Sequence, residues 1–134
     1  TSRKFSEEVH RTPLTVGHVR ARTHGEVTEA NAHPFRVERK DGSFIIGVHN
    51  GSLLNWRANI DADKYEVDSQ WLYSKIAEDG LEAFAGFDGA YTLVWYDSST
   101  PGKMYIARDH KGQRGLFFGY SAKKDAMFGC SEVG

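Results

Sequence analysis

The order of the expected structural elements constrains the fold of this chain more than any other feature. Apolar residues alternate on both sides of Asp41-Gly42, which predicts a β-hairpin with strands in "FRVER" and "SFIIGV". A helix is predicted over "VDSQWLYSKIAEDG", with Asp68 or Ser69 as its cap and Gly80 at its end. Further strands are predicted in "AYTLVWYD", "KMYIARD", "GLFFGYS" and "AMFGCS". Strands on both sides of a helical middle predict an α+β fold with mostly antiparallel pairing.

Length and charge exclude several classes of protein. A chain of 134 residues suits one domain, and 8 Phe, 6 Tyr and 3 Trp argue against disorder. The net charge is −1 and no block of Lys and Arg is present, so we expect no nucleic-acid partner. No apolar run reaches the length of a membrane span, so we expect no membrane association. The single cysteine excludes an internal disulfide and favours a cytoplasmic location.

The stretch "GVHNGSLLNW" combines a strand with an Asn-Gly pair but is not followed by a second alternating run. A hairpin turn is therefore not expected at Asn50-Gly51, although Asn-Gly is a strong hairpin signal. A helix is predicted from Leu53 to Ile60, because the apolar residues there fall at helical spacing, with Ser52 as the cap. A strand that ends in Asn-Gly can present a side-chain amide and a backbone N–H together. Two such donors aimed at one point are what an oxyanion hole requires.

Other polar residues stand where predicted elements begin or end. The strand predicted over "LTVGHVRA" ends at Arg20, and Thr23 and His24 follow it, while Asp68 opens the main helix. Polar side chains at such positions form either a site on a rigid scaffold or a set of solvated turns. Four histidines can approach one another, but their spacings match no usual ligand pattern, so no metal site is expected: His18, His24, His33 and His49.

Three motifs together resemble the class II, N-terminal nucleophile (Ntn), glutamine amidotransferase domain. They are "GHVRARTHGEVTEANAHPF", "GVHNGSLLNW" and "VDSQ", which occur in the order found in that family. The strands predicted after the helix look like the later strands of the same domain. The resemblance implies one domain over residues 1–134, with a four-layer αββα fold of two stacked, mostly antiparallel sheets. It also implies hydrolysis of the side-chain amide of L-glutamine through a thioester, without a cofactor, and delivery of ammonia to a synthase domain or partner protein.

The resemblance also implies roles for individual residues. Arg20 is similar to the arginine that binds the α-carboxylate of glutamine, for which a guanidinium fork is well suited. Asp68 is similar to the carboxylate that pairs with the α-ammonium. Thr23 and His24 are similar to pocket-lining residues, and His33 to a residue that supports their loop. The catalytic pair implied by the resemblance is Asn50 and Gly51, which would form the oxyanion hole.

The chain departs from the family pattern at three places. Ala21 stands where some members carry Trp, and Gln70 stands where Glu is usual. The family nucleophile is a cysteine at the mature N-terminus, and no corresponding strand is present here. Cys130 lacks an α-amine to activate it, and we expect it to be a small buried strand residue. Thr1 has an α-amine, but "TSRKFSEEV" is not an apolar strand. We therefore expect the sequence to be incomplete at its N-terminal side and inactive alone.

Three functions are compatible with these observations. The first is a glutamine-hydrolysing amidotransferase domain, the second is a catalytically degenerate Ntn-type domain that binds a ligand or protein, and the third is a hydrolase with a metal on its histidines. A Cys-Gly-Ile-like segment upstream of Thr1 would favour the first over the second, and metal analysis would test the third.

Overall fold

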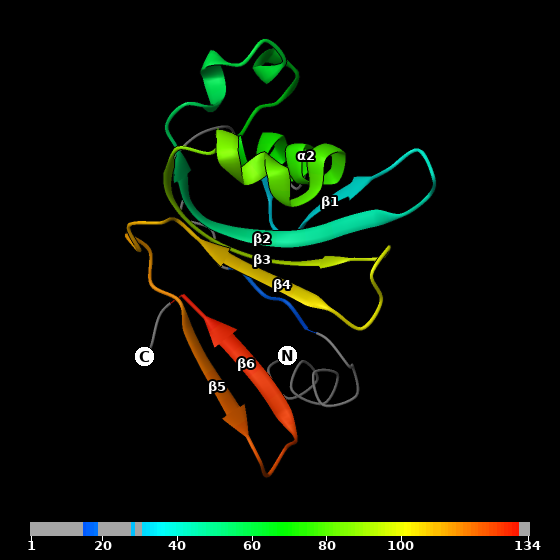
Figure 1. Ribbon diagram of the computed structural model, residues 1–134, viewed down its shortest axis with the longest axis vertical. Helices are drawn as coiled ribbons and strands as arrows, with labels where there is room; N and C mark the ends of the chain where they lie inside the picture. The colour runs from blue at the N-terminus through cyan, green and yellow to red at the C-terminus, as the bar shows by residue number, and fades with distance from the viewer. Residues whose placement is uncertain (1–14, 19–27, 29–30, 132–134) are drawn as a thin grey trace.

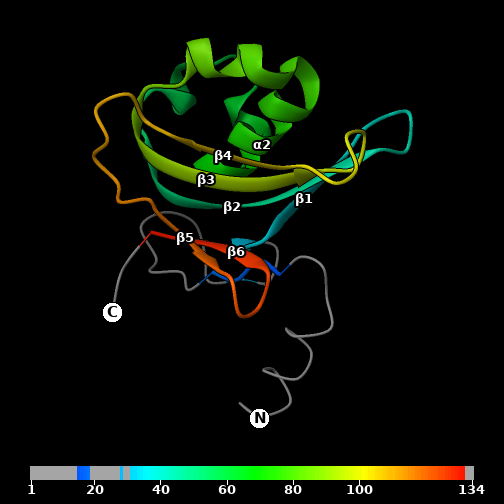
Figure 2. The same ribbon diagram turned by 60° about the horizontal axis from the view of Figure 1, so that its bottom comes forward.

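The computed structural model describes residues 15–18, 28 and 31–131. Two antiparallel sheets and one α-helix are the main elements of these residues. Helix α2 (Asp68–Asp79) lies on one face of the larger sheet, and a two-stranded sheet lies on the other side (Figures 1 and 2). The predicted α+β class with antiparallel pairing is confirmed. The larger sheet has the order β1-β2-β3-β4, and the smaller pairs β5 with β6. The strands are β1 (Phe35–Glu38), β2 (Phe44–Leu53), β3 (Gly89–Asp97), β4 (Met104–Arg108), β5 (Phe117–Ser121) and β6 (Ala126–Cys130).

The hairpin predicted around Asp41-Gly42 is confirmed. Strands β1 and β2 pair antiparallel, with Phe35 opposite Gly47. Gly42 has φ +83, a left-handed value that glycine adopts without steric cost. Of the earlier strand predicted over residues 14–21, the described part is residues 15–18, and these carry no strand assignment.

Strand β2 continues beyond the Asn-Gly pair, so the prediction that it ends there is wrong. It pairs with β3 as far as Leu53, which lies opposite Gly89. The helix predicted from Leu53 is also wrong, because Leu54 and Ile60 are exposed while Leu53 is buried, and they share no apolar face. Ser52 is part of β2 and caps no helix. Two short 3-10 helices follow instead, η2 (Trp56–Ala58) and η3 (Ala62–Lys64).

Helix α2 matches the predicted range and ends as predicted. Gly80, with φ +63, closes it and begins the 3-10 helix η4 (Gly80–Gly86). The predicted capping is wrong, because Val67 occupies the N-cap position and no side chain bonds to the first backbone N–H groups there. Asp68 and Ser69 lie inside the first turn and are buried. Their polar atoms are therefore directed to partners elsewhere.

The core between α2 and the larger sheet holds the helix close to β2. Tyr73 has no exposed surface, and a Cβ atom on Gly47 would lie 2.6 Å from its ring. No residue larger than glycine fits at position 47 without displacing this ring. The Tyr73 hydroxyl donates a hydrogen bond of 2.6 Å to the carbonyl of Val48. Packing and hydrogen bonding thus fix α2 directly beside the segment that carries His49 and Asn50.

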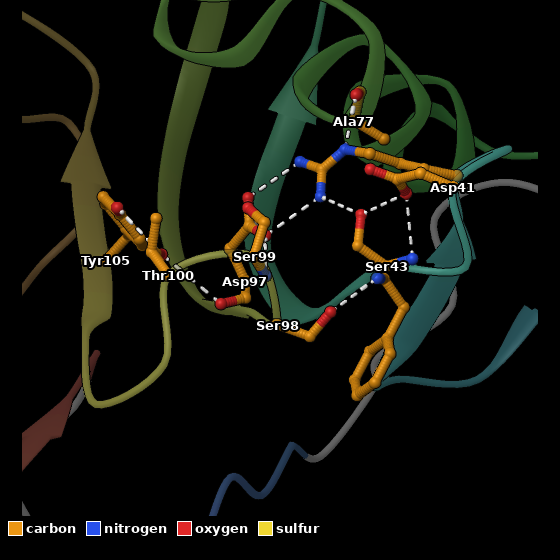
Figure 3. A network of polar contacts seen from close by, with 10 residues as sticks. Asp41, Ser43, Ala77, Asp97, Ser98, Ser99, Thr100 and Tyr105 are labelled. Carbon is orange, nitrogen blue, oxygen red and sulfur yellow. Dashed lines mark hydrogen bonds and ion pairs between the residues drawn. The ribbon is translucent and has the colours of Figure 1, made fainter.

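A polar network connects several elements at the other end of the larger sheet (Figure 3). Arg39 donates two hydrogen bonds to the Asp97 carboxylate and one of 2.8 Å to the carbonyl of Ala77. Ser43 accepts a further bond from Arg39. These contacts connect the β1–β2 turn, the end of β3 and the last turn of α2.

Candidate active site

Asn50 and Gly51 lie within β2, opposite Thr92 and Tyr91 of β3. Gly51 has φ +141, and a Cβ atom there would be 1.9 Å from the carbonyl oxygen of Ala90. A side chain at this position is excluded both by the backbone angle and by the contact with β3. Gly51 is therefore required by packing within the sheet rather than by a turn.

The side chain of Asn50 points to the face of the sheet opposite α2. Alternate residues of a strand point to opposite faces, and the neighbouring His49 contacts α2. The β5–β6 hairpin lies on the face toward which Asn50 points (Figures 1 and 2). Asn50 is half-buried.

Asp68 is anchored to the end of β2. Its Oδ2 atom accepts a hydrogen bond of 2.9 Å from the backbone N–H of Leu53. Its Oδ1 atom accepts a long contact of 3.5 Å from the Ser69 hydroxyl. Asp68 as a whole is 9% exposed, so its side chain is largely enclosed. Within the part of the chain that the structure describes, the contact from Ser69 is the one hydrogen bond that Oδ1 accepts, and a buried carboxylate oxygen with a single long bond is a good acceptor for a cationic group.

His49 and Ser69 form a buried hydrogen bond between β2 and α2. The Nδ1 atom of His49 lies 2.8 Å from the Ser69 hydroxyl oxygen. Burial lowers the pKa of His49 to about 4, although the Asp68 carboxylate acts in the opposite direction, while His18 and Arg114 lower it further. The imidazole is therefore neutral at pH 7. Sequence reasoning did not assign this bond, because nothing in the local pattern connects residues 49 and 69.

The rings of His18, His33 and His49 lie close to one another. The ring centroids of His18 and His33 are 3.9 Å apart, and those of His33 and His49 are 6.5 Å apart. The expectation that these histidines approach one another is confirmed for the three that the structure describes. No three His, Cys, Asp or Glu side chains in residues 15–18, 28 and 31–131 are arranged to hold a metal ion.

The loop after β4 is organised by a carboxylate that sequence reasoning missed. Burial alone raises the pKa of Asp109, but bonds from the backbone N–H groups of Gln113 and Tyr91, among others, hold it below its ordinary value. The Thr92 hydroxyl donates a bond of 3.1 Å to the carbonyl of Gly115 in the same loop. Because Thr92 lies opposite Asn50, this loop reaches the side of the candidate site. The "RDHKGQRG" stretch, with its Asp and two Gly residues, could have indicated such a loop.

Gln70, which departs from the usual Glu, bridges α2 and the segment before β1. Its side-chain oxygen accepts the backbone N–H of Glu66, and its amide donates to Asn31 at 3.0 Å. Asn31 in turn donates to the Glu66 carboxylate. A Glu at position 70 would place a second carboxylate beside that of Glu66, so the neutral amide suits this cluster.

Several predicted residues lie outside the described part of the chain. They are the predicted substrate-binding residues Arg20, Thr23 and His24, together with Thr1 and Ala21. Their roles stay predictions. Among the predicted site residues that are described, the structure brings the β2 segment bearing Asn50 and Gly51 beside the start of α2, through the Leu53–Asp68 bond.

Cys130 is exposed, and the prediction that it is a buried strand residue is wrong. It lies at the end of β6, whose residues are all exposed. Strand β6 pairs only with β5 in the described part of the chain, so no further strand covers it there.

Among the described residues, no helix is long and apolar enough to pass through a lipid bilayer.

Comparison with solved structures supports the fold. Glutamine phosphoribosylpyrophosphate amidotransferase from B. subtilis matches with a TM-score of 0.62 and 21% identity, over 78% of this chain and 25% of that one. The allosteric regulatory enzyme of purine biosynthesis matches with a TM-score of 0.55 and 20% identity, over 67% of this chain and 22% of that one. The fold described above is therefore similar to that of part of each of these two structures.

Sequence comparison identifies the family. The chain is 34% identical to glutamine–fructose-6-phosphate aminotransferase (isomerizing) of Streptococcus pneumoniae, over 70% of this chain and 18% of the relative. The corresponding protein of Idiomarina loihiensis is also 34% identical, over 78% of this chain and 20% of the relative. The chain thus spans about a fifth of the length of the curated relatives it matches. A family model described as a glutamine amidotransferase domain matches residues 5–133. The chain therefore belongs to the glutamine amidotransferase domain family, as its class II motifs led us to expect.

Proposed function

We propose that the native protein containing residues 1–134 hydrolyses the side-chain amide of L-glutamine and supplies the ammonia to an acceptor. The observation that carries this proposal is the position of Asp68. Its carboxylate does not cap α2 but is bonded to Leu53, two residues beyond Gly51. The carboxylate proposed to bind the α-ammonium is thereby bonded to the strand that carries the candidate oxyanion donors, Asn50 and Gly51.

The proposed reaction assigns one role to each of these groups. The Asp68 carboxylate binds the α-ammonium of glutamine, and Arg20 binds the α-carboxylate. A cysteine thiolate, the nucleophile of the family, attacks the δ-carbon, and the carbonyl oxygen gains negative charge. The Asn50 amide and the Gly51 N–H stabilise this charge, ammonia leaves with a transferred proton, and water then cleaves the thioester to glutamate.

Residues 1–134 are proposed to form one domain that is inactive on its own. The buried apolar residues of β1, β2, α2 and β3 belong to one core cluster, which supports a single domain. Cys130 is the one cysteine in the sequence, and it is exposed at the end of β6. An internal cysteine has no α-amine to act as base, so Cys130 is a poor candidate for the nucleophile.

Glutamine binding tests the proposal directly. The Asp68→Asn variant keeps the shape of the side chain but removes its charge, so glutamine affinity measured by calorimetry should fall at least about 30-fold. Arg20→Ala should weaken binding to a similar degree, and Arg20→Lys should recover little because the bidentate fork is lost. Asp63→Asn, at an exposed position in η3, is the matched control and should bind as the parent does. Equal affinity in Asp68→Asn and the parent would exclude the proposed role.

A further inference from the structure

A buried bond joins the two candidate binding elements at the residues that flank the functional ones. His49 directly precedes Asn50, and Ser69 directly follows Asp68. The 2.8 Å bond between His49 and Ser69 therefore connects the oxyanion segment of β2 to the ammonium-binding turn of α2.

We propose that the His49–Ser69 bond sets the separation between Asn50 and Asp68 and so selects glutamine over shorter amide side chains. This inference rests on the proposed function, because it takes Asn50 and Asp68 as the two ends of the glutamine site. His49 and Ser69 are positioning residues in this proposal, and neither touches the substrate.

Burial makes this bond difficult to replace. His49 is 3% exposed and Ser69 is 5% exposed, so water cannot readily substitute for either partner. Within residues 15–18, 28 and 31–131, the Nε2 atom of His49 has no hydrogen-bond partner. The Ser69 hydroxyl is therefore the polar anchor that fixes the ring in the described structure.

Two further hydrogen bonds from α2 place Asn50 and Gly51 within a fixed span. Tyr73 bonds to the carbonyl of Val48 on one side of the pair, and Asp68 bonds to Leu53 on the other. The His49–Ser69 bond lies between them. Of the three, it is the one nearest to Asn50 in sequence, and its Ser69 hydroxyl also makes the long, 3.5 Å contact with Oδ1 of Asp68.

A fixed separation discriminates between amide side chains of different length. Glutamine and asparagine carry the same α-groups and the same amide, but asparagine has one methylene fewer. A rigid site that binds the α-ammonium at one end and the amide oxygen at the other cannot satisfy both ends of asparagine. One missing methylene typically changes recognition by about 10- to 200-fold. Relaxing the separation should reduce this factor, because the shorter molecule can then reach both ends.

The test compares L-glutamine with L-asparagine in the native protein that contains residues 1–134. The selectivity is the ratio of their dissociation constants from calorimetry, or of kcat/KM for ammonia release where turnover occurs. The parent should prefer glutamine by about 10-fold or more. Ser69→Ala should lower the ratio by about fivefold or more, mainly through tighter asparagine binding. Ser69→Thr keeps the hydroxyl and should retain the parent ratio within about twofold.

A matched control separates this effect from general destabilisation. Ser43→Ala removes a hydroxyl from the Arg39 network at the other end of the sheet and should leave the ratio unchanged. Thermal unfolding of each variant establishes that it is folded. An unchanged ratio in Ser69→Ala, an equal loss in Ser69→Thr, or a parent without preference would each overturn the inference while leaving the proposed function intact. A folded parent that does not bind glutamine would instead overturn the proposed function, and the inference with it.

Discussion

The guanidinium of Arg39 forms two parallel hydrogen bonds with the carboxylate of Asp97, of 2.9 and 2.7 Å. The pair joins the β1–β2 turn to the end of β3, and the two side chains are 21% and 14% exposed. A bidentate pair of this kind is stronger than an exposed ion pair, because solvent screens it less.

Replacing Arg39 should therefore destabilise the fold without altering the candidate site. Arg39→Lys retains the charge but loses the fork, so the free energy of unfolding should fall by about 2 kcal/mol in chemical denaturation. Arg36→Lys is the matched control, because Arg36 pairs with Glu38 at an exposed position. That change should cost less than about 0.5 kcal/mol. Equal losses of unfolding free energy in the two variants would show that the Arg39–Asp97 pair stabilises the fold no more than an exposed ion pair.

Stability should depend on pH through His49. Its pKa is about 4 in the folded protein, below the ordinary value of 6.5, because burial disfavours the charged ring. Between these two values the unfolded chain binds a proton that the folded chain does not, so stability falls as pH decreases through this window. The contribution of His49 should decline by about 2 kcal/mol between pH 7 and pH 5.

The His49→Asn variant isolates this effect. Asparagine can keep a hydrogen bond to Ser69 but does not titrate. The difference in unfolding free energy between parent and variant, measured by denaturation at several pH values, should therefore shift against the parent below pH 6.5. A constant difference across the window would contradict a buried, neutral His49.

Gly51 should tolerate no side chain. A Cβ atom would meet the Ala90 carbonyl at 1.9 Å, so Gly51→Ala should cost more than about 3 kcal/mol of unfolding free energy or prevent folding. Gly102→Ala is the control, because Gly102 also has positive φ, at +81, but no atom lies within 4 Å of its Cβ position. That change should cost about 1 kcal/mol from backbone strain alone. Comparable losses would mean that the contact with β3 is unimportant.

A polypeptide of residues 1–134 that begins at Thr1 should release no ammonia from L-glutamine in a coupled glutamate dehydrogenase assay. Cys130 is exposed and should react with a thiol reagent in the native state, yet Cys130→Ala should change nothing in the ammonia assay. Activity that disappears with Thr1→Ala would instead make Thr1 the nucleophile. Activity that disappears with Cys130→Ala would assign that role to Cys130.

Features determined by neighbouring residues could be predicted from the sequence. The Asp41-Gly42 hairpin and the end of α2 at Gly80 depend on local backbone angles, and both are found where expected. The end of β2 could not be predicted, because Gly51 is required by contact with Ala90, which is distant in sequence. The hydrogen bond of Asp68 could not be predicted either, because its partner is the backbone N–H of Leu53 rather than an N–H of its own helix.

The sequence predicts the residues of the candidate site more fully than the hydrogen bonds that hold those residues in place. Asn50, Gly51 and Asp68 were recognised from motifs, and the structure connects the two elements that carry them. The His49–Ser69 bond and the Asp109-centred loop were not, because both depend on pairings across 18 or more residues.

The most direct test of the account is the turnover of Asn50 variants in a native, glutamine-hydrolysing form of the protein. If Asn50 stabilises the oxyanion, both Asn50→Ala and Asn50→Gly should lower kcat by about two to three orders of magnitude with little change in KM, because both lack the amide donor. If Asn50 serves only the backbone, Asn50→Gly should turn over as the parent does, since glycine adopts any backbone angle that Asn adopts. Near-parental kcat in a folded Asn50→Gly variant would contradict the assigned catalytic role.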